Sequence, residues 1–98
     1  SGELVPLMET ARVEGRASGT LGVVGIDKTV EVTVQRQYRL RDSGCARLRV
    51  SLDQRGVTLP GETNPRDRHT EFAMNWCEGG RPPASSDGAG PAEPEGQP

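Results

Sequence analysis

The chain is poor in large apolar side chains. Of its 98 residues, 32% are hydrophobic, and the aromatic residues are Tyr38, Phe72 and Trp76. No apolar run approaches the roughly 20 residues that a membrane-spanning helix needs. Almost nothing apolar follows Gly79, so the core must come from roughly 70 residues, a size at which the hydrophobic effect alone gives marginal stability. We therefore expect one small domain that needs an additional cross-link.

Metal ligands and catalytic groups are also scarce. The chain has two cysteines and one histidine, without a CxxC motif, which is too little for a structural zinc site. His69 has Asp67 and Glu71 beside it, and carboxylates can orient a catalytic imidazole. No nucleophile is marked, however, and a surface histidine in a charged loop is the interpretation we favour. We expect no cofactor, no metal and no enzymatic activity.

Two cysteines, Cys45 and Cys77, are available for the cross-link. A disulfide between them would close a loop of about 32 residues, for which the chain-entropy model gives roughly 3.5–4 kcal/mol. Unpaired thiols in a reducing compartment are the alternative. Stable disulfides form in oxidising compartments, so the disulfide predicts an exported protein that is periplasmic, at the cell surface or extracellular.

Two segments alternate apolar and polar side chains in the manner of a half-buried strand. In residues 28–41 the even positions from Val30 onward are apolar or aromatic apart from Arg36, and in residues 45–53 the even positions are apolar. Residues 42–44, with the sequence Asp-Ser-Gly, suit a three-residue turn that ends in a left-handed glycine. The pattern predicts a β-hairpin.

That turn would fix the register of the hairpin, with the apolar faces of the two strands on the same side. The expected cross-strand pairs are Arg41 with Cys45, Leu40 with Ala46, Tyr38 with Leu48, Arg36 with Val50, and Val34 with Leu52.

An arginine-rich solvent face follows from this register. Arg39 would lie opposite Arg47, with Arg49 further along the same strand and Arg41 near the turn. Like charges directly opposite each other destabilise a strand pair. Acidic side chains such as Glu71 on the next strand, or an anionic partner, must therefore compensate. These four arginines are the candidate binding residues for an anionic or acidic partner.

Weaker alternation predicts further strands. Residues 11–23 place small side chains at inward positions, so we expect this strand either to pack closely against another element or to bulge at its glycines. Residues 57–59 form a short apolar piece, residues 62–68 a polar loop and residues 25–27 a turn. Residues 69–77 read as the last strand, and no segment shows a convincing helical repeat. The expected fold is all-β: an antiparallel meander of four to five strands that forms a small sandwich or open barrel.

The C-terminal segment differs in composition from the rest. Residues 79–98 consist mainly of proline, glycine, alanine, serine and acid, and Asp87, Glu93 and Glu95 have no basic neighbour. Such a segment cannot offset the entropy of ordering. The sequence thus predicts a flexible lead over residues 1–8, a β domain over 9–78 and a disordered tail over 79–98.

A non-enzymatic, exported binding or assembly module is the favoured function. It would recognise a protein partner through strand edges and the arginine-rich face. One alternative is an anion- or nucleic-acid-binding domain that uses the same arginines, although the inward parity of Tyr38 and Trp76 leaves no stacking platform for bases. Another is a secreted enzyme inhibitor that inserts the loop from Pro60 to His69.

Overall fold

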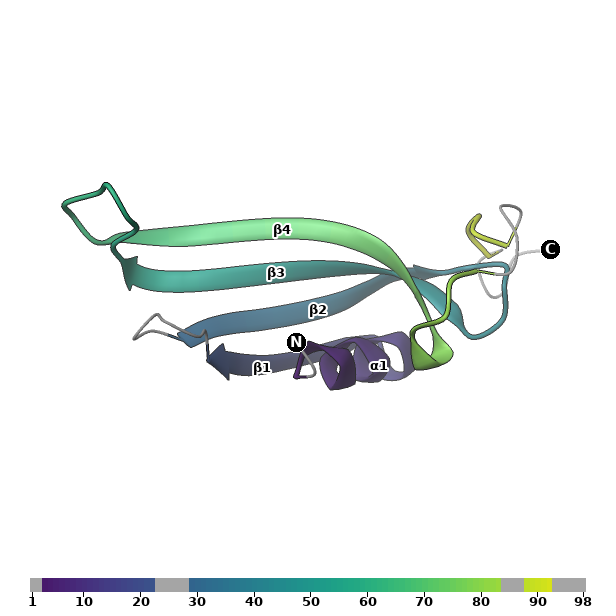
Figure 1. The fold of residues 1–98 in the computed structure, drawn as a ribbon. Coiled ribbons are helices and arrows are strands. Elements are labelled where there is room, and N and C mark those ends of the chain that lie inside the picture. Colours follow the sequence, from purple (N-terminus) through teal and green to yellow (C-terminus); the bar gives the residue numbers. More distant parts are fainter. Residues whose placement is uncertain (1–2, 23–28, 84–87, 93–98) are drawn as a thin grey trace.

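A computed structural model describes residues 3–22, 29–83 and 88–92 of the chain (Figure 1). One antiparallel sheet holds four strands in chain order: β1 (Arg16–Gly22), β2 (Thr29–Arg39), β3 (Cys45–Val57) and β4 (Arg66–Cys77). The helices are α1 (Leu4–Glu14) and the short 3-10 helix η1 (Glu78–Gly80). The predicted antiparallel β meander of four to five strands is confirmed: the structure is mostly strands, in a single open four-stranded sheet with the helix α1 packed on one face. None of the helices in these ranges has the length and apolarity to cross a bilayer.

The helix α1 is the element that the sequence pattern did not predict. Its sheet-facing side chains recur at helical spacing: Leu4, Leu7, Met8 and Ala11. Gly15, with a φ of 99°, ends the helix in the left-handed conformation. Residues 4–8 thus belong to a helix rather than to a flexible lead, and the strand expected from residue 11 begins at Arg16. The stripe of four apolar residues is short, and its last member, Ala11, also fits the alternating pattern that follows.

Small inward side chains on β1 are explained by the close approach of α1. A Cβ atom added at Gly19 would lie 3.1 Å from Cδ1 of Leu7, so a larger residue would require the Leu7 side chain to shift by a few tenths of an ångström. The close packing expected for this strand is confirmed. The buried core between helix and sheet consists of Met8, Ala11, Val30, Val32, Val34, Ala46, Leu48 and Val50.

Arg36 fastens the C-terminal end of α1 to the sheet. Its Nη1 donates to the carbonyl oxygens of Arg12 at 2.9 Å and Val13 at 3.3 Å. Its backbone N–H donates to the carbonyl oxygen of Gly15 at 2.8 Å. The last carbonyls of a helix lack partners within the helix and carry partial negative charge, so a guanidinium stabilises them.

The predicted register between β2 and β3 is wrong by two residues along most of the hairpin. Val34 pairs with Val50, two positions from its expected partner. One residue of the shift comes from the loop. The backbone N–H of Leu40 donates to the carbonyl oxygen of Cys45 at 3.0 Å, so the loop has four residues rather than three. Gly44 adopts the expected left-handed conformation, with a φ of 83°.

A β-bulge at Gln37 supplies the second residue of the shift. The pairing changes register between Arg36 and Tyr38, which leaves Gln37 as an extra residue on β2. Side chains alternate along a strand, so one extra residue reverses the face to which every later residue points. Tyr38, expected in the core, is 42% exposed on the opposite face.

The hairpin of β3 and β4 is longer than predicted. β3 continues to Val57 past an irregularity in its pairing after Gln54, and β4 already begins at Arg66. The connecting loop therefore shortens to residues 58–65. The turn expected at residues 25–27 lies outside the described ranges.

The predicted disulfide between Cys45 and Cys77 is confirmed, and it joins directly paired residues of β3 and β4. Both cysteines are buried together with Leu40 in a second small cluster, apart from the core beneath α1. Leu40 contacts the cysteines instead of the main core because the bulge at Gln37 has reversed its face.

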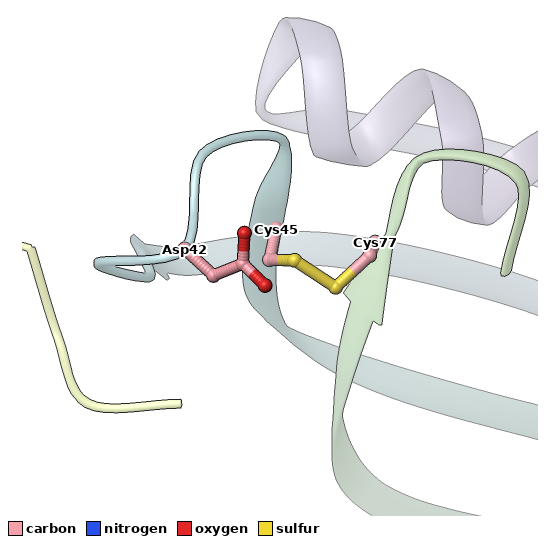
Figure 2. A group of neighbouring side chains, drawn as sticks. All are labelled: Asp42, Cys45 and Cys77. Atoms are coloured by element: carbon pink, nitrogen blue, oxygen red, sulfur yellow. A yellow bond between two sulfur atoms is a disulfide. The ribbon is translucent and has the colours of Figure 1, made fainter. Parts of the chain in front are cut away.

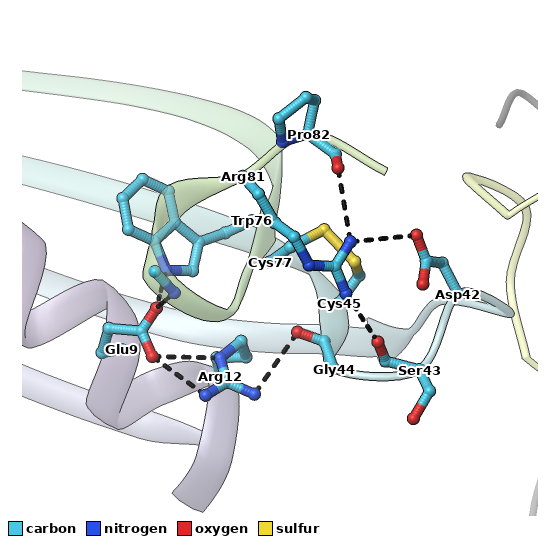
Figure 3. Close-up of a disulfide and its surroundings, with 11 residues drawn as sticks. Glu9, Arg12, Asp42, Ser43, Gly44, Cys45, Trp76, Cys77, Arg81 and Pro82 are labelled. Atoms are coloured by element: carbon cyan, nitrogen blue, oxygen red, sulfur yellow. Dashed lines mark hydrogen bonds and ion pairs between the residues drawn. A yellow bond between two sulfur atoms is a disulfide. The ribbon is translucent and has the colours of Figure 1, made fainter. Parts of the chain in front are cut away.

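Glu9 ties α1 to this end of the sheet (Figure 3). Its Oε1 accepts from Nε1 of Trp76 at 2.7 Å and from the backbone N–H of Gly79 at 3.0 Å, and its Oε2 accepts from Nη2 of Arg12 at 2.9 Å. Burial raises the pKa of Glu9, but the hydrogen bonds from Arg12, Trp76 and Gly79 together hold that pKa below its ordinary value. The ionised carboxylate thus joins the helix, β4 and η1.

Candidate functional site

The bulge at Gln37 places the four candidate arginines on opposite faces of the sheet. Arg39 pairs with Ala46, which belongs to the core beneath α1, whereas Arg47 pairs with the exposed Tyr38. Directly paired side chains lie on the same face. Arg39 and Arg47 are therefore not cross-strand neighbours, and the predicted single arginine face does not form.

Arg47 and Arg49 lie on the face away from α1, where they form hydrogen bonds with side chains of β4. Nη1 of Arg47 donates to Oδ1 of Asn75 at 3.2 Å. Nη1 of Arg49 donates to Oε2 of Glu71 at 3.0 Å. The sequence left open whether the next strand or an anionic partner compensates the arginine charges. For Arg47 and Arg49, the next strand, β4, provides the contacts.

His69 extends this row of polar contacts across the same face. Its Nδ1 lies 2.6 Å from Oδ1 of Asp53, and its Nε2 lies 2.9 Å from Oε1 of Glu71. The hydrogen bonds to Asp53 and Glu71 raise the pKa of His69. Asp67, the other expected neighbour, instead accepts from the backbone N–H of Gly56 at 3.0 Å. Both ring nitrogens of His69 are engaged by carboxylates, so the exposed imidazole belongs to a charge ladder on the sheet.

Arg39 and Arg41 line a cleft on the α1 side of the sheet, at the end that carries the disulfide. The cleft has a volume of about 460 Å³, and its lining also includes Arg12 and Val13 of α1, the turn of residues 43–45, and Ala92. Among the residues that the structure describes, the lining has three arginines and no acid, and Arg12 is paired with Glu9 of α1 at 2.9 Å. An anionic group would therefore find favourable electrostatics in this cleft.

The edge of the sheet at the C-terminal end of β2 is not covered by β1, and it lies next to the cleft. The pairing of β1 with β2 ends at Arg16 and Gln35, followed by the hydrogen bond from Arg36 to Gly15. The next part of the edge, residues 39–42, is occupied by residues 88–92 of the tail, drawn in yellow in Figure 1.

The tail segment meets this edge through an isolated antiparallel β-bridge. Pro91 forms a bridge with Leu40. Three backbone hydrogen bonds hold the segment: Ala92 N–H to Arg39 oxygen at 2.7 Å, Arg41 N–H to Gly90 oxygen at 2.8 Å, and Asp42 N–H to Gly88 oxygen at 3.0 Å. These contacts are all to the backbone, which is how strand addition recognises an extended chain.

Asp42 lies beside the disulfide (Figure 2). Its carboxylate and the Sγ atoms of Cys45 and Cys77 lie within 4.8 Å of one another. Both sulfurs are held in the disulfide and are not thiolate ligands, so this group is not a metal centre. Oδ2 of Asp42 accepts from Nη1 of Arg81 at 3.2 Å, and Nη2 of Arg81 donates to the carbonyl oxygen of Ser43 at 2.9 Å (Figure 3). Arg81 thus braces the turn next to the open edge.

Comparisons with protein-family models, with curated proteins and with solved structures find no match to this chain. The geometry of the edge and the cleft therefore carries the functional interpretation.

Sequence patterns pointed to Arg39 and Arg41 but not to Arg12 or to residues 88–92. Arg12 lies in a helix that the alternation concealed. The tail segment binds through its backbone, which leaves no side-chain signature in the sequence. Its small residues, Gly-Ala-Gly-Pro-Ala, permit close approach to a strand edge, but the same composition is typical of a linker.

Proposed function

We propose that this protein is a non-enzymatic binding module that takes up an extended segment of a protein partner as an added strand. The site is the β2 edge at residues 39–42 together with the adjoining arginine-lined cleft. The observation that carries the proposal is the antiparallel seating of residues 88–92 on this edge through three backbone hydrogen bonds. An edge that holds one chain segment through its backbone N–H and carbonyl groups has the geometry to hold another.

The charge of the cleft favours an acidic partner. Arg39 and Arg41 bring guanidiniums to the described lining beside Ala92, and Arg12, which is paired with Glu9, lies next to them. Arg47 and Arg49 lie on the other face and contact Asn75 and Glu71, so the four candidate arginines offer no continuous surface to a nucleic acid. This distribution supports a local acidic segment over a long polyanion.

Export and the absence of catalysis are parts of the same proposal. The disulfide is consistent with an oxidising compartment, such as the periplasm, the cell surface or the extracellular space. His69, the histidine of the chain, has both ring nitrogens bound to carboxylates on an exposed face, which supports a structural role over that of a general base.

The test uses the full-length chain with the substitution Ala92→Pro. Proline lacks the N–H that donates to Arg39, so the tail loses a backbone hydrogen bond and leaves the edge open. The probe is a fluorescein-labelled peptide with the sequence of residues 88–98. We expect saturable binding by fluorescence anisotropy, about tenfold tighter for Ala92→Pro than for the wild type.

The matched control is Ala92→Gly, which keeps the N–H and should bind the probe as the wild type does. Perturbed backbone amide signals of Arg41 and Asp42 in the complex would place the probe on the edge. Failure of the probe to bind the wild type and Ala92→Pro alike would overturn the proposal.

A further inference from the structure

We infer that the edge selects its ligand by two features. The first is a proline opposite Leu40 that is followed directly by a residue with a backbone N–H. The second is a set of acidic residues after that pair. The inference rests on the proposed function and names the class of segment that the site takes. The ligand is an extended, acidic, proline-containing stretch of a partner protein.

The alternation of hydrogen bonds along the edge sets the proline requirement. Leu40 directs its N–H inward, to the carbonyl oxygen of Cys45, so it offers no donor to a ligand. Arg39 and Arg41, on either side of it, direct a carbonyl oxygen and an N–H outward to the tail. The ligand residue opposite Leu40 is therefore at a non-hydrogen-bonded position of the antiparallel ladder, where its own N–H has no partner on the edge.

Proline suits that position and is excluded from the next. It has no N–H to lose, and its fixed φ makes the segment stiffer before binding, which lowers the entropy cost of ordering. The following residue must donate to the carbonyl oxygen of Arg39, as Ala92 does at 2.7 Å. A proline shifted by one residue removes this bond and introduces a ring where the edge needs a donor.

The acidic requirement comes from the place at which the ligand leaves the edge, beside the cleft. Ala92, the last described residue of the seated segment, lines the same cleft as Arg12, Arg39 and Arg41. A ligand residue that follows this position therefore passes next to the guanidiniums. In the chain itself the residues that follow are Glu93, Pro94 and Glu95, so its own sequence has the composition that this selection predicts.

Three peptides test the inference on the full-length Ala92→Pro protein. The parent is Gly-Ala-Gly-Pro-Ala-Glu-Pro-Glu-Gly-Gln-Pro. The shifted peptide exchanges the first proline with the alanine after it, and the neutral peptide carries glutamine in place of both glutamates. We expect the shifted peptide to bind about tenfold more weakly than the parent, the equivalent of one lost hydrogen bond. The neutral peptide should also bind about tenfold more weakly at low salt, with a difference that shrinks as salt is added.

A pair of arginine variants of Ala92→Pro links the acidic preference to the cleft. Arg41→Gln removes a cleft guanidinium and should weaken the parent peptide while leaving the neutral peptide unchanged. Arg47→Gln removes the same charge from the opposite face and should weaken neither. Because both substitutions keep the backbone, they leave the hydrogen-bonding edge intact.

The outcomes separate the inference from the proposed function. Equal binding of all three peptides would overturn the inference and leave strand addition in place, whereas binding of none would overturn both. Equal binding of parent and neutral peptides, or equal losses with Arg41→Gln and Arg47→Gln, would overturn the acidic requirement.

Discussion

At the scale of single residues, the protonation state of His69 depends on its two carboxylate neighbours. The hydrogen bonds to Asp53 and Glu71 raise its pKa above the ordinary value of 6.5, so the folded protein favours the imidazolium. Glu71 has the opposite shift: the hydrogen bond from His69, joined by one from Arg49, keeps its pKa below the ordinary 4.5.

These shifts predict a window of pH in which the ladder stabilises the fold. The contribution of His69 is fully present below its unfolded pKa of about 6.5 and is lost as pH rises through the raised folded pKa. The contribution of Glu71 is present above about 4.5 and is lost as pH falls through its lowered pKa. We expect the free-energy difference between wild type and His69→Gln, measured by urea unfolding, to be largest between about pH 4.5 and 6.5.

An NMR titration provides the control for this window. Glu71→Gln should move the pKa of His69 back toward its ordinary value, because one of its two carboxylate partners is gone. Stability curves for wild type and His69→Gln that run parallel from pH 4 to 9 would contradict the prediction.

The residue-scale expectations that held were those that depend on composition or on neighbours in the chain. The small size and poor core of the domain predicted that its two cysteines pair. The nearness of Glu71 to His69 in the chain predicted their contact. Asp53 as the second partner of His69 depends on the pairing of β3 with β4. The sequence offered Asp67 instead, because it is nearer in the chain.

At the scale of elements, Gln37 decides which face the end of β2 presents. The bulge puts two β2 residues, Arg36 and Gln37, opposite Leu48, and it sends Arg39 toward the cleft beneath α1. Without the extra residue, pairing would continue from Arg36 directly to Tyr38. The residues before and after the bulge would then point to the same faces of the sheet as they do now.

Deletion of Gln37 is therefore expected to be tolerated. We predict a free energy of unfolding within about 1 kcal/mol of wild type by urea denaturation, because no core residue changes face. Deletion of Thr33 is the matched control. It lies in regular pairing with both Ser18 and Ser51, so its loss would turn Val30 and Val32 out of the core and unfold the domain. Equal damage from both deletions would contradict this account of the bulge.

The strands of the central hairpin were predictable as elements, whereas their register was not. Alternation identifies a strand but does not reveal an extra residue within it, and Gln37 fits the pattern of either face. The helix α1 was missed for a related reason. Four apolar residues at helical spacing predict a helix, but the last of them, Ala11, also fits the alternating pattern that continues into β1. The packing of Leu7 on Gly19 favours the helix over a longer strand.

At the scale of the whole molecule, the disulfide secures the end of the sheet that carries the cleft. Replacing Cys45 and Cys77 by alanine removes a link that closes a loop of 32 residues. We predict a loss of roughly 3.5–4 kcal/mol in the free energy of unfolding, since the unfolded chain regains the entropy of that loop. Alkylation of the wild type in denaturant should add no mass until a reductant is present. Labelling without reductant in protein from its native compartment would contradict the disulfide, and with it the argument for export.

The seating of the tail also bears on how copies of this chain meet. Ten residues separate Cys77 from Gly88, and so short a tether keeps the tail at an effective concentration on the order of millimolar near its own edge. The same bonds made to a neighbour would join two different surfaces, a donor tail and an acceptor edge. Reciprocal exchange of tails between two copies would give a closed dimer, whereas the same contact repeated in one direction would give rings or filaments. The effective concentration set by the tether is therefore the threshold that we expect: at lower protein concentrations each tail should stay on its own edge, and tails should pair with neighbouring edges only at higher ones.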